Sequence, residues 1–369
     1  MNSLQELRRL GQSIWLDYIR RDLITSGRLK RLIEEDGVHG ITSNPTIFAN
    51  AISEDSDYDS AIEQILRESP ELGSPALFEK IEIEDLRMAA DALRPIYDQT
   101  NGDDGFVSIE VSPRIAYDTD QSVSEARRLW AEVARPNLMV KIPATYEGLP
   151  AIEQLISEGI NVNVTLMFSV SQYAQVAEAY LRGIERAADP RRVRSVASFF
   201  VSRVDTAVDK ALDEVGTREA LELRGKTAIA NAKLAYRRFR AVFSSARFET
   251  LKARGIHLQK PLWASTSTKN KAYTDVMYVE GLIGSDTINS MPPETLEAFR
   301  DHGRPRVALG AGEDEAEEIV GKLARMGIIL KSIGQELTDE GVDKFAKSYD
   351  ELIQALDKKR SAILQTLAA

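Results

Sequence analysis

Eight short runs of strand-forming residues alternate along this chain with segments whose apolar residues recur at helical spacing. The strand runs span residues 13–18, 38–42, 106–111, 138–142, 161–168, 193–201, 261–264 and 286–289. Strands that alternate with helices pair in parallel through right-handed crossovers. Eight such units favour a closed barrel over an open sheet, and no strand is followed by the Gly-x-Gly-x-x-Gly turn of dinucleotide-binding folds. The alternation therefore predicts a (β/α)8 TIM barrel of the α/β class.

The helical segments lie between these strands and after the last of them. They are expected at residues 58–68, 77–97, 122–134, 148–158, 171–187 and 313–326. Ser122 and Glu125 have the spacing of a capping box, which predicts that their helix begins at residue 122.

Two further stretches exceed what a minimal barrel needs. Residues 217–255 form a long helical pattern, and residues 338–367 form a C-terminal one that we expect to pack over the barrel. The first stretch contains an apolar stripe made of Ala228, Ala232, Ala235 and Phe239. Such a stripe is typical of helix packing rather than of ligand binding. No linker rich in Pro, Gly or Ser divides the chain, so we expect residues 1–369 to form a single barrel domain with these helical additions.

The composition limits the classes of partner. The chain has 369 residues, 43% of them hydrophobic, which is enough for a large core. Its net charge is −10 and its pI is about 5.1. Nucleic acids and anionic membranes bind basic surfaces, so this balance disfavours both as partners. It does not disfavour a phosphorylated small molecule, since a phosphate needs only local positive charge.

The chain has no cysteine and only three histidines, His39, His257 and His302. Disulfides, thiolate catalysis and cysteine-based metal sites are therefore excluded, and the scattered histidines do not suggest a metal site. The first ten residues are charged and amphipathic, and no run of 18 apolar residues occurs. We expect a cytoplasmic protein that is a monomer or a homodimer.

A lysine interrupts an apolar run near the middle of the chain. Lys141 is the charged residue within Asn-Leu-Met-Val-Lys-Ile-Pro-Ala-Thr at 137–145. Lysine is depleted in strands, and burying an ammonium group is costly unless it is paired or neutralised. Desolvation lowers the pKa of a lysine and so populates an amine that can attack a carbonyl. The alternatives are a lysine that protects an edge strand and one whose ammonium reaches water.

Polar residues stand at the C-terminal ends of the other predicted strands as well, where a barrel of this kind builds its chemistry. In chain order these ends carry Asp17, Asn44, Glu110, Lys141, Thr165, Ser198 or Arg203, Ser267 and Lys269, and Asn289. Taken singly, Asp17 could cap a helix, Asn44 could form a turn with the following proline, and Glu110 could belong to a structural ion pair. Thr165 could be present only because threonine has a high strand propensity, and the basic residues could be solvated charges.

Together these residues supply the groups that carbonyl chemistry on a sugar phosphate requires. The amine provides a nucleophile, the carboxylates provide general acid and base catalysis, and the cations hold a phosphate. The combination therefore favours a catalytic site over a set of separate structural roles.

Eight motifs in order along the chain resemble those of the transaldolase family. They are Trp-Leu-Asp at 15–17, Thr-Ser-Asn-Pro-Thr at 42–46, Ile-Glu-Val at 109–111, Val-Lys-Ile-Pro-Ala at 140–144, Asn-Val-Thr-Leu-Met-Phe at 163–168, Ser-Phe-Phe-Val-Ser-Arg-Val-Asp at 198–205, Trp-Ala-Ser-Thr-Ser-Thr-Lys-Asn at 263–270 and Asp-Thr-Ile-Asn-Ser-Met-Pro-Pro at 286–293. The chain length and the long helical stretch resemble the larger transaldolase type, some members of which are fused to a phosphoglucose isomerase.

The resemblance implies a dihydroxyacetone transfer of the pentose phosphate pathway, from sedoheptulose 7-phosphate or fructose 6-phosphate to glyceraldehyde 3-phosphate or erythrose 4-phosphate. Lys141 would form a Schiff base with the ketose. Glu110 would shuttle protons through a water that Thr165 orients, and Asp17 would deprotonate the C4 hydroxyl.

The resemblance also implies the substrate-binding residues. Asn44, Asn163 and Ser198 would lie around the three-carbon unit. Arg203, Ser267 and Lys269 would bind the substrate phosphate. Many transaldolases carry arginine where this chain has Lys269, and lysine lacks the bidentate fork of arginine. No metal or organic cofactor is implied, because the protonated imine is the electron sink.

Two other functions remain open at this point. A class I aldolase similar to fructose-6-phosphate aldolase would release free dihydroxyacetone, although the small barrels with that activity lack a glutamate at the position of Glu110. A non-catalytic barrel that binds sugar phosphates is a third reading. It predicts loss of the lysine or of one carboxylate, and Lys141, Glu110 and Asp17 are all present.

Overall fold

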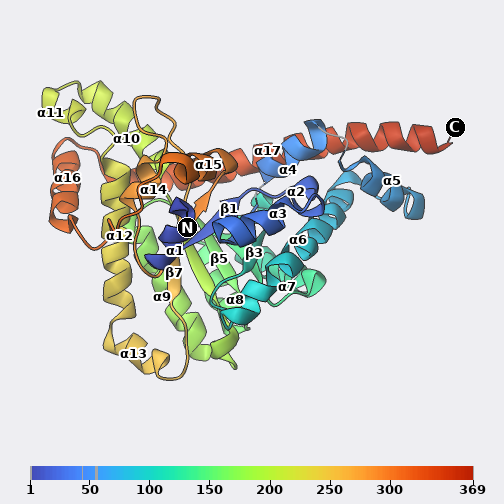
Figure 1. Cartoon of the computed structure of the whole chain (residues 1–369), viewed down its shortest axis with the longest axis horizontal. Coiled ribbons are helices and arrows are strands. Elements are labelled where there is room, and N and C mark those ends of the chain that lie inside the picture. Colours follow the sequence, from blue (N-terminus) through green and yellow to red (C-terminus); the bar gives the residue numbers. More distant parts are fainter. Residues whose placement is uncertain (1, 44, 55–56, 369) are drawn as a thin grey trace.

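Eight parallel strands close into a barrel in the computed structural model, which describes residues 2–43, 45–54 and 57–368 (Figure 1). The strands are β1 (Gln12–Asp17), β2 (Val38–Thr42), β3 (Phe106–Glu110), β4 (Leu138–Pro143), β5 (Val162–Met167), β6 (Ser195–Phe200), β7 (Gln259–Ala264) and β8 (Thr287–Met291). Each strand pairs with the next in sequence, and β8 pairs with β1. The prediction of a (β/α)8 barrel is confirmed, and all eight predicted strands occur with boundaries displaced by at most a few residues.

The helices surround the barrel and extend beyond it. The α-helices are α1 (Ser3–Arg9), α2 (Arg21–Thr25), α3 (Arg28–Arg31), α4 (Pro45–Glu54), α5 (Asp59–Glu68), α6 (Ser74–Gln99), α7 (Thr119–Val133), α8 (Gly148–Ser157), α9 (Val170–Arg186), α10 (Ser202–Val215), α11 (Arg218–Leu221), α12 (Thr227–Phe243), α13 (Ala246–Lys252), α14 (Met277–Gly281), α15 (Pro293–His302), α16 (Glu313–Arg325) and α17 (Leu330–Ala368). Shorter π and 3-10 turns occur at Leu32–Asp36, Pro113–Ile115 and Pro190–Arg192.

Two local expectations need correction. The helix predicted to begin at residue 122 begins at Thr119, because the side chain of Asp118 caps it by accepting from the backbone N–H of Gln121. The Ser122 hydroxyl instead donates to the carbonyl of Ile115 at 3.1 Å, and Glu125 accepts from the backbone N–H of Ser112. The capping-box spacing therefore occurred by coincidence inside a helix.

The stretch 217–255 is not one helix but the three helices α11, α12 and α13. Its predicted apolar stripe, Ala228, Ala232, Ala235 and Phe239, lies on α12 and is buried in the hydrophobic core. The structural reading of that stripe is confirmed.

The interior of the barrel is filled by side chains from alternate strand positions. One cluster contains Trp15, Phe106, Met139, Val196, Leu262 and Ile288. The residues between them along the strands, such as Ile14 and Val140, belong to the larger core that the helices cover. Trp15 needs room inside the barrel, and Gly40 provides it: a Cβ at residue 40 would lie 2.4 Å from the indole ring.

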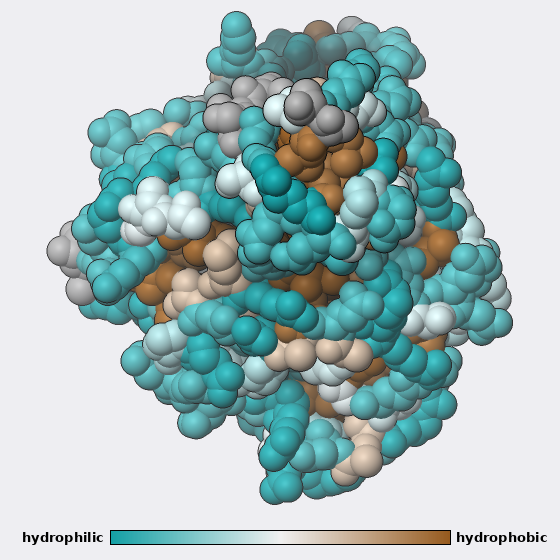
Figure 2. All heavy atoms as spheres, turned by 90° about the vertical axis from the view of Figure 1, so that its right-hand side faces the viewer, coloured by the Kyte–Doolittle hydropathy of each residue, from teal (hydrophilic) through white to brown (hydrophobic). Residues whose placement is uncertain are grey.

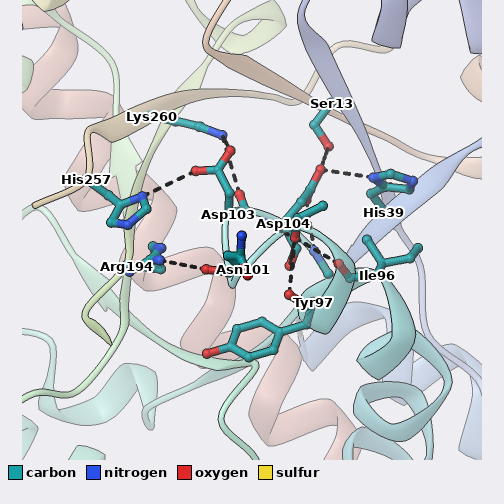
Figure 3. A network of polar contacts seen from close by, with 12 residues as sticks. Ser13, His39, Ile96, Tyr97, Asn101, Asp103, Asp104, Arg194, His257 and Lys260 are labelled. Atoms are coloured by element: carbon teal, nitrogen blue, oxygen red, sulfur yellow. Dashed lines mark hydrogen bonds and ion pairs between the residues drawn. The ribbon is translucent and has the colours of Figure 1, made fainter. Parts of the chain in front are cut away.

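A polar network closes the amino end of the barrel, by which we mean the N-terminal ends of the strands. The loop before β3 turns under the barrel and places two carboxylates there (Figure 3). Asp104 accepts hydrogen bonds from the Ser13 hydroxyl at 2.5 Å and from the Trp15 indole at 3.0 Å. Asp103 forms an ion pair with Lys260 at 2.6 Å. This network ties β1 and β7 to the loop.

Helix α17 crosses the opposite, carboxyl end of the barrel and continues past α5 toward the C-terminus (Figure 1). It begins at Leu330, eight residues before the predicted start, and packs against α4, α6 and β5. Thr338 anchors it by donating to the carbonyl of Leu166 at 3.1 Å. The expectation of a C-terminal helix over the barrel is confirmed.

The surface seen from the side of the C-terminus is mostly hydrophilic, and hydrophobic side chains gather there in hollows (Figure 2). Every helix in the described ranges is too short or too polar to span a membrane.

Candidate active site

Polar side chains line the carboxyl end of the barrel because of the strand periodicity. Side chains two residues apart on a strand share a face. Asp17 follows Trp15 on the inner face, and Lys141 follows Met139 in the same way. The strands thus carry apolar residues at the middle of the barrel and polar ones at its carboxyl end.

A cavity of about 190 Å³ opens at this end. Its lining includes seven residues predicted from the sequence: Asp17, Lys141, Thr165, Ser198, Arg203, Ser267 and Lys269. Glu110 and Asn163 are not in the lining, but both are register neighbours of Lys141, on β3 and β5 respectively. Asn44 lies outside the described residues. Seven of the ten predicted residues therefore share one cavity, and two more adjoin it.

Lys141 is buried in the wall of the barrel, with 7% of its side chain exposed. Its Nζ donates to the backbone carbonyl of Ser43 at 2.8 Å and lies 3.9 Å from Oε2 of Glu110. The gap to the carboxylate is too long for a direct hydrogen bond and suits one bridging group. The amine is thus held by a neutral acceptor, with a carboxylate within reach of a shared water or substrate atom.

Two buried carboxyls face this lysine. Burial raises the pKa of Asp17, against the opposing effects of Lys141 and of the Thr42 hydroxyl, which donates to Asp17 at 2.7 Å. Burial likewise raises the pKa of Glu110, and the charge of Lys141 opposes this shift. Raised pKa values bring carboxyl groups closer to the range in which they can both accept and donate protons at neutral pH.

A chain of hydrogen bonds fixes the polar residues next to the lysine. Ser198 donates to Oδ1 of Asn163 at 2.7 Å, and Nδ2 of Asn163 donates to Ser108 at 3.0 Å. The hydroxyl of Thr165 is buried and has no hydrogen-bond partner among the described residues. Thr165 can therefore offer its hydroxyl to a ligand or a water in the cavity.

The backbone is strained where two strands reach the site. Leu166, the residue after Thr165, has φ +56°, and Ser265, just past β7, has φ +56° as well. Residues with a side chain rarely adopt this left-handed conformation, and such strain clusters at functional sites. Here it occurs at Ser265 and directly after Thr165, two residues that line the cavity.

The basic residues stand at the outer part of the cavity. Arg203 lies in the first turn of α10, and its guanidinium lies over the rings of Phe200 at 5.4 Å and Phe345 at 6.0 Å. Lys269 donates to the Ser267 hydroxyl at 2.7 Å. In the described part of the chain, neither Arg203 nor Lys269 forms an ion pair.

The structure adds lining residues that the sequence reading missed. They are Thr42, Phe200, Leu262, Ala264, Ser265, Ser290, Pro292, Glu294 and Phe345. Thr42 and Ser290 stand at strand ends and could have been found from the strand periodicity. Phe345 belongs to α17, 76 residues beyond Lys269, and no local pattern connects it to the barrel mouth.

A third carboxyl lies behind Glu110. Glu82 of α6 and Glu110 line a small cavity of about 50 Å³ together with Glu125 and Tyr349. Burial, with a smaller contribution from the nearby carboxyl of Glu110, raises the pKa of Glu82 to about 8. Sequence reasoning missed Glu82 because a glutamate in an amphipathic helix is ordinarily on the solvent side.

The arrangement can perform proton transfers around an amine. It contains a buried lysine amine held by a backbone carbonyl, two carboxyls with raised pKa values, a hydroxyl without a hydrogen-bond partner among the described residues, and an outer group of cations. Across the described ranges, no group of three or more His, Asp or Glu side chains is arranged to hold a metal ion.

Comparison with known proteins gives a consistent result. The profile of the transaldolase/fructose-6-phosphate aldolase family matches residues 14–356. The chain is 48% identical to a transaldolase of Thiobacillus denitrificans over 357 residues, covering 96% of this chain and 99% of that protein. It is 47% identical to a transaldolase of Thermobifida fusca, with 97% and 98% covered, and 46% identical to one of Mycolicibacterium smegmatis, with 96% of each covered.

Proposed function

Because this chain belongs to the transaldolase/fructose-6-phosphate aldolase family and is an enzyme of the transaldolase type, we propose that it transfers a dihydroxyacetone unit between sugar phosphates. The donors are sedoheptulose 7-phosphate and fructose 6-phosphate, and the acceptors are glyceraldehyde 3-phosphate and erythrose 4-phosphate. The observation that carries this proposal is the buried amine of Lys141, which has a carboxylate 3.9 Å away and an open cavity beside it.

The first chemical step is formation of a Schiff base. The free amine of Lys141 attacks the C2 carbonyl of the ketose and gives a carbinolamine. Loss of its hydroxyl as water requires a proton, which Glu110 delivers through a water held by Thr165. The 3.9 Å separation of Nζ and Oε2 supports transfer through a bridging atom, and the unpartnered hydroxyl of Thr165 supports the water position.

Carbon–carbon cleavage follows from the protonated imine. Asp17 takes the proton from the C4 hydroxyl, the C3–C4 bond breaks, and its electron pair passes into the imine to give an enamine on Lys141. The aldose phosphate leaves. The raised pKa of Asp17 supports its role as a base that can return the proton in the reverse direction.

The remaining residues hold the substrate. Asn163 and Ser198 are linked to each other at 2.7 Å beside Lys141, where the hydroxyls of the three-carbon unit would lie, and Asn44 is assigned to the same unit from the sequence. Arg203, Ser267 and Lys269 would bind the phosphate at the outer part of the cavity. Transfer is completed when a second aldose phosphate takes up the enamine and hydrolysis frees Lys141.

Release of free dihydroxyacetone is the alternative outcome of the same enamine. It differs from transfer only in whether water or an acceptor aldose arrives first. An assay without acceptor distinguishes the two, because a transferase releases at most one aldose phosphate per site whereas an aldolase turns over.

Borohydride trapping tests the proposal directly. Wild type is incubated with fructose 6-phosphate, reduced with borohydride, digested and analysed by mass spectrometry. We expect a reduced three-carbon adduct on the peptide that contains Lys141 and none on Lys260, a lysine of the amino end that is paired with Asp103. A folded protein that carries no adduct on Lys141 would overturn the Schiff-base mechanism.

A further inference from the structure

A larger hollow of about 680 Å³ lies outside the candidate active site. It shares with the inner cavity the lining residues Asp17, Arg203, Lys269, Pro292, Glu294 and Phe345. One residue that lines only this outer hollow is Lys344 of α17. The C-terminal helix, from which no site residue was predicted, thus contributes a cation to the mouth.

The mouth holds more positive charge than its carboxyls neutralise by contact. Within the described ranges, Arg203, Lys269 and Lys344 form no ion pair, whereas the fourth lining cation, Arg20, is paired with Asp57 at 2.7 Å. The charge of Arg203 lowers the pKa of Lys344, followed by partial burial and the charge of Lys269. Three mutually repelling cations around one hollow indicate that an anion completes the arrangement.

Three carboxyls lie near these cations. Glu340 of α17 opposes the lowering of the pKa of Arg203 through its charge, but forms no ion pair with Arg203 in the described ranges. Asp17 already accepts a hydrogen bond from Thr42 and lies at the inner end of the cavity. Glu294 of α15 also lines both spaces, but it forms no ion pair with a described residue. Within the described residues, none of these carboxyls forms an ion pair with the three cations, so all three can contact an anionic ligand.

Helix α17 is fixed on both sides of Lys344. Before it, Thr338 donates to the carbonyl of Leu166 at 3.1 Å and accepts from Gln172 at 2.8 Å. After it, Ser348 is hydrogen-bonded to Thr46 at 2.9 Å. The adjacent Phe345 packs under the guanidinium of Arg203. Lys344 therefore has a defined backbone position and an exposed side chain.

We propose that Lys344 is a further phosphate ligand of this enzyme, which closes the phosphate site from the C-terminal helix opposite Arg203 and Lys269; this inference rests on the function proposed above. The three residues come from three separate elements, namely α17, α10 and the loop after β7. A phosphate monoester carries three terminal oxygens, so each cation can meet a different one.

This position makes Lys344 a specificity residue rather than a catalytic one. Its ammonium meets the phosphate end of the sugar, remote from the carbonyl that reacts at Lys141. An interaction made equally in the ground state and in the transition state changes KM and leaves kcat unaltered. Lys344 therefore favours phosphorylated substrates over their neutral analogues.

The test compares Lys344→Gln with Lys347→Gln, a matched control one turn further along α17, where Lys347 lies 3.9 Å from Glu351. Binding of inorganic phosphate is measured by calorimetry at low ionic strength. KM is measured for erythrose 4-phosphate and for unphosphorylated erythrose.

We expect Lys344→Gln to weaken phosphate binding and to raise the KM for erythrose 4-phosphate by roughly tenfold, the scale of one charge-assisted hydrogen bond. The KM for erythrose, kcat and the melting temperature should stay as in wild type, and Lys344→Arg should retain the affinity. Lys347→Gln should change none of these values.

Unchanged phosphate affinity in Lys344→Gln, or an equal rise in KM for both acceptors, would overturn the inference. Failure of the proposed function is recognised separately by borohydride trapping of wild type with dihydroxyacetone, which needs no phosphate. If borohydride labels Lys141 in wild type but Lys344→Gln binds phosphate as wild type does, the proposed function stands and only the role of Lys344 is refuted.

Discussion

Both ends of the barrel carry lysine and carboxyl groups, but the two ends differ in how these groups are hydrogen-bonded and ion-paired. At the amino end, Asp104 accepts from Ser13 and Trp15, and Asp103 pairs with Lys260 at 2.6 Å. At the carboxyl end, the amine of Lys141 is bound by a backbone carbonyl, and Oε2 of Glu110 has no hydrogen-bond partner in the described part of the chain.

This difference separates stability from chemistry within one fold. A buried carboxylate that is fully hydrogen-bonded stabilises the native state and is unreactive. A buried amine or carboxyl left partly unsatisfied costs folding free energy but can bind and react. Substitutions at the amino end should therefore change stability, and those at the carboxyl end should change turnover.

Lys141→Met is the strongest test of this difference between the two ends of the barrel. We expect turnover to fall by at least about 10³-fold, because a nucleophile is lost, whereas the methionine fills the same apolar space. The melting temperature should stay within about 3 °C of wild type. Lys260→Met is the control at the other end, and it should keep full turnover. Substantial activity in folded Lys141→Met would contradict the assignment of the nucleophile.

Asp17→Ala should stop the reaction one step later. We expect carbon–carbon cleavage to slow by about 10²–10⁴-fold, the usual contribution of a general base. Imine formation should continue, so borohydride should trap the intact six-carbon sugar on Lys141. Single-turnover release of glyceraldehyde 3-phosphate is the measurement, and a normal rate of release would remove the proposed role of Asp17.

Asp104→Asn should have the opposite effect: it should lower stability and leave turnover unchanged. The amide offers one acceptor where the carboxylate has two, so a donor from Ser13 or Trp15 is left buried and unpaired. We expect the free energy of unfolding to fall by about 2–3 kcal/mol, with kcat unchanged below the melting transition. Denaturant unfolding measures the first quantity. A loss of kcat larger than the loss of folded protein would mean that the two ends are coupled.

Glu82→Gln should appear as a change in the pH dependence of stability. The folded-state pKa of Glu82 is raised from 4.5 to about 8, so the folded state binds this proton more tightly than the unfolded state does. Stability from this group is present at low pH and is lost as pH rises through the window from 4.5 to about 8. Between pH 6 and 7 wild type should lose about 1.4 kcal/mol that the variant keeps.

Burial is the largest cause of the raised pKa of Glu82; the charges of Glu110, Glu79 and Asp85 raise it as well, and the charge of Lys141 opposes the shift. Equal slopes of stability against pH in wild type and Glu82→Gln would show that Glu82 ionises normally in the folded protein.

Much of this molecule could be predicted from the sequence. The eight strands were identified because buried parallel strands leave apolar runs that periodicity detects, and Lys141 was conspicuous because a charge rarely interrupts such a run. Seven of the predicted site residues line one cavity, since parallel strands of a barrel deliver their ends to the same rim.

The capping box at Ser122 and Glu125 shows where local patterns fail. The spacing was correct, but a stronger cap, Asp118, stands one turn earlier and starts the helix first. Likewise, the pattern over 217–255 did not reveal the breaks between α11, α12 and α13, because helical periodicity continues through short turns.

The sequence by itself determined the barrel, the residues at its strand ends and the presence of a C-terminal helix, because these depend on residue types a few positions apart. Only the tertiary structure decided that α17 brings Phe345 and Lys344 to the barrel mouth, that the loop before β3 closes the amino end, and that Glu82 lies behind Glu110. The physical reason is distance along the chain. Contacts between residues far apart in sequence form through packing of whole elements, and no local pattern records which elements meet.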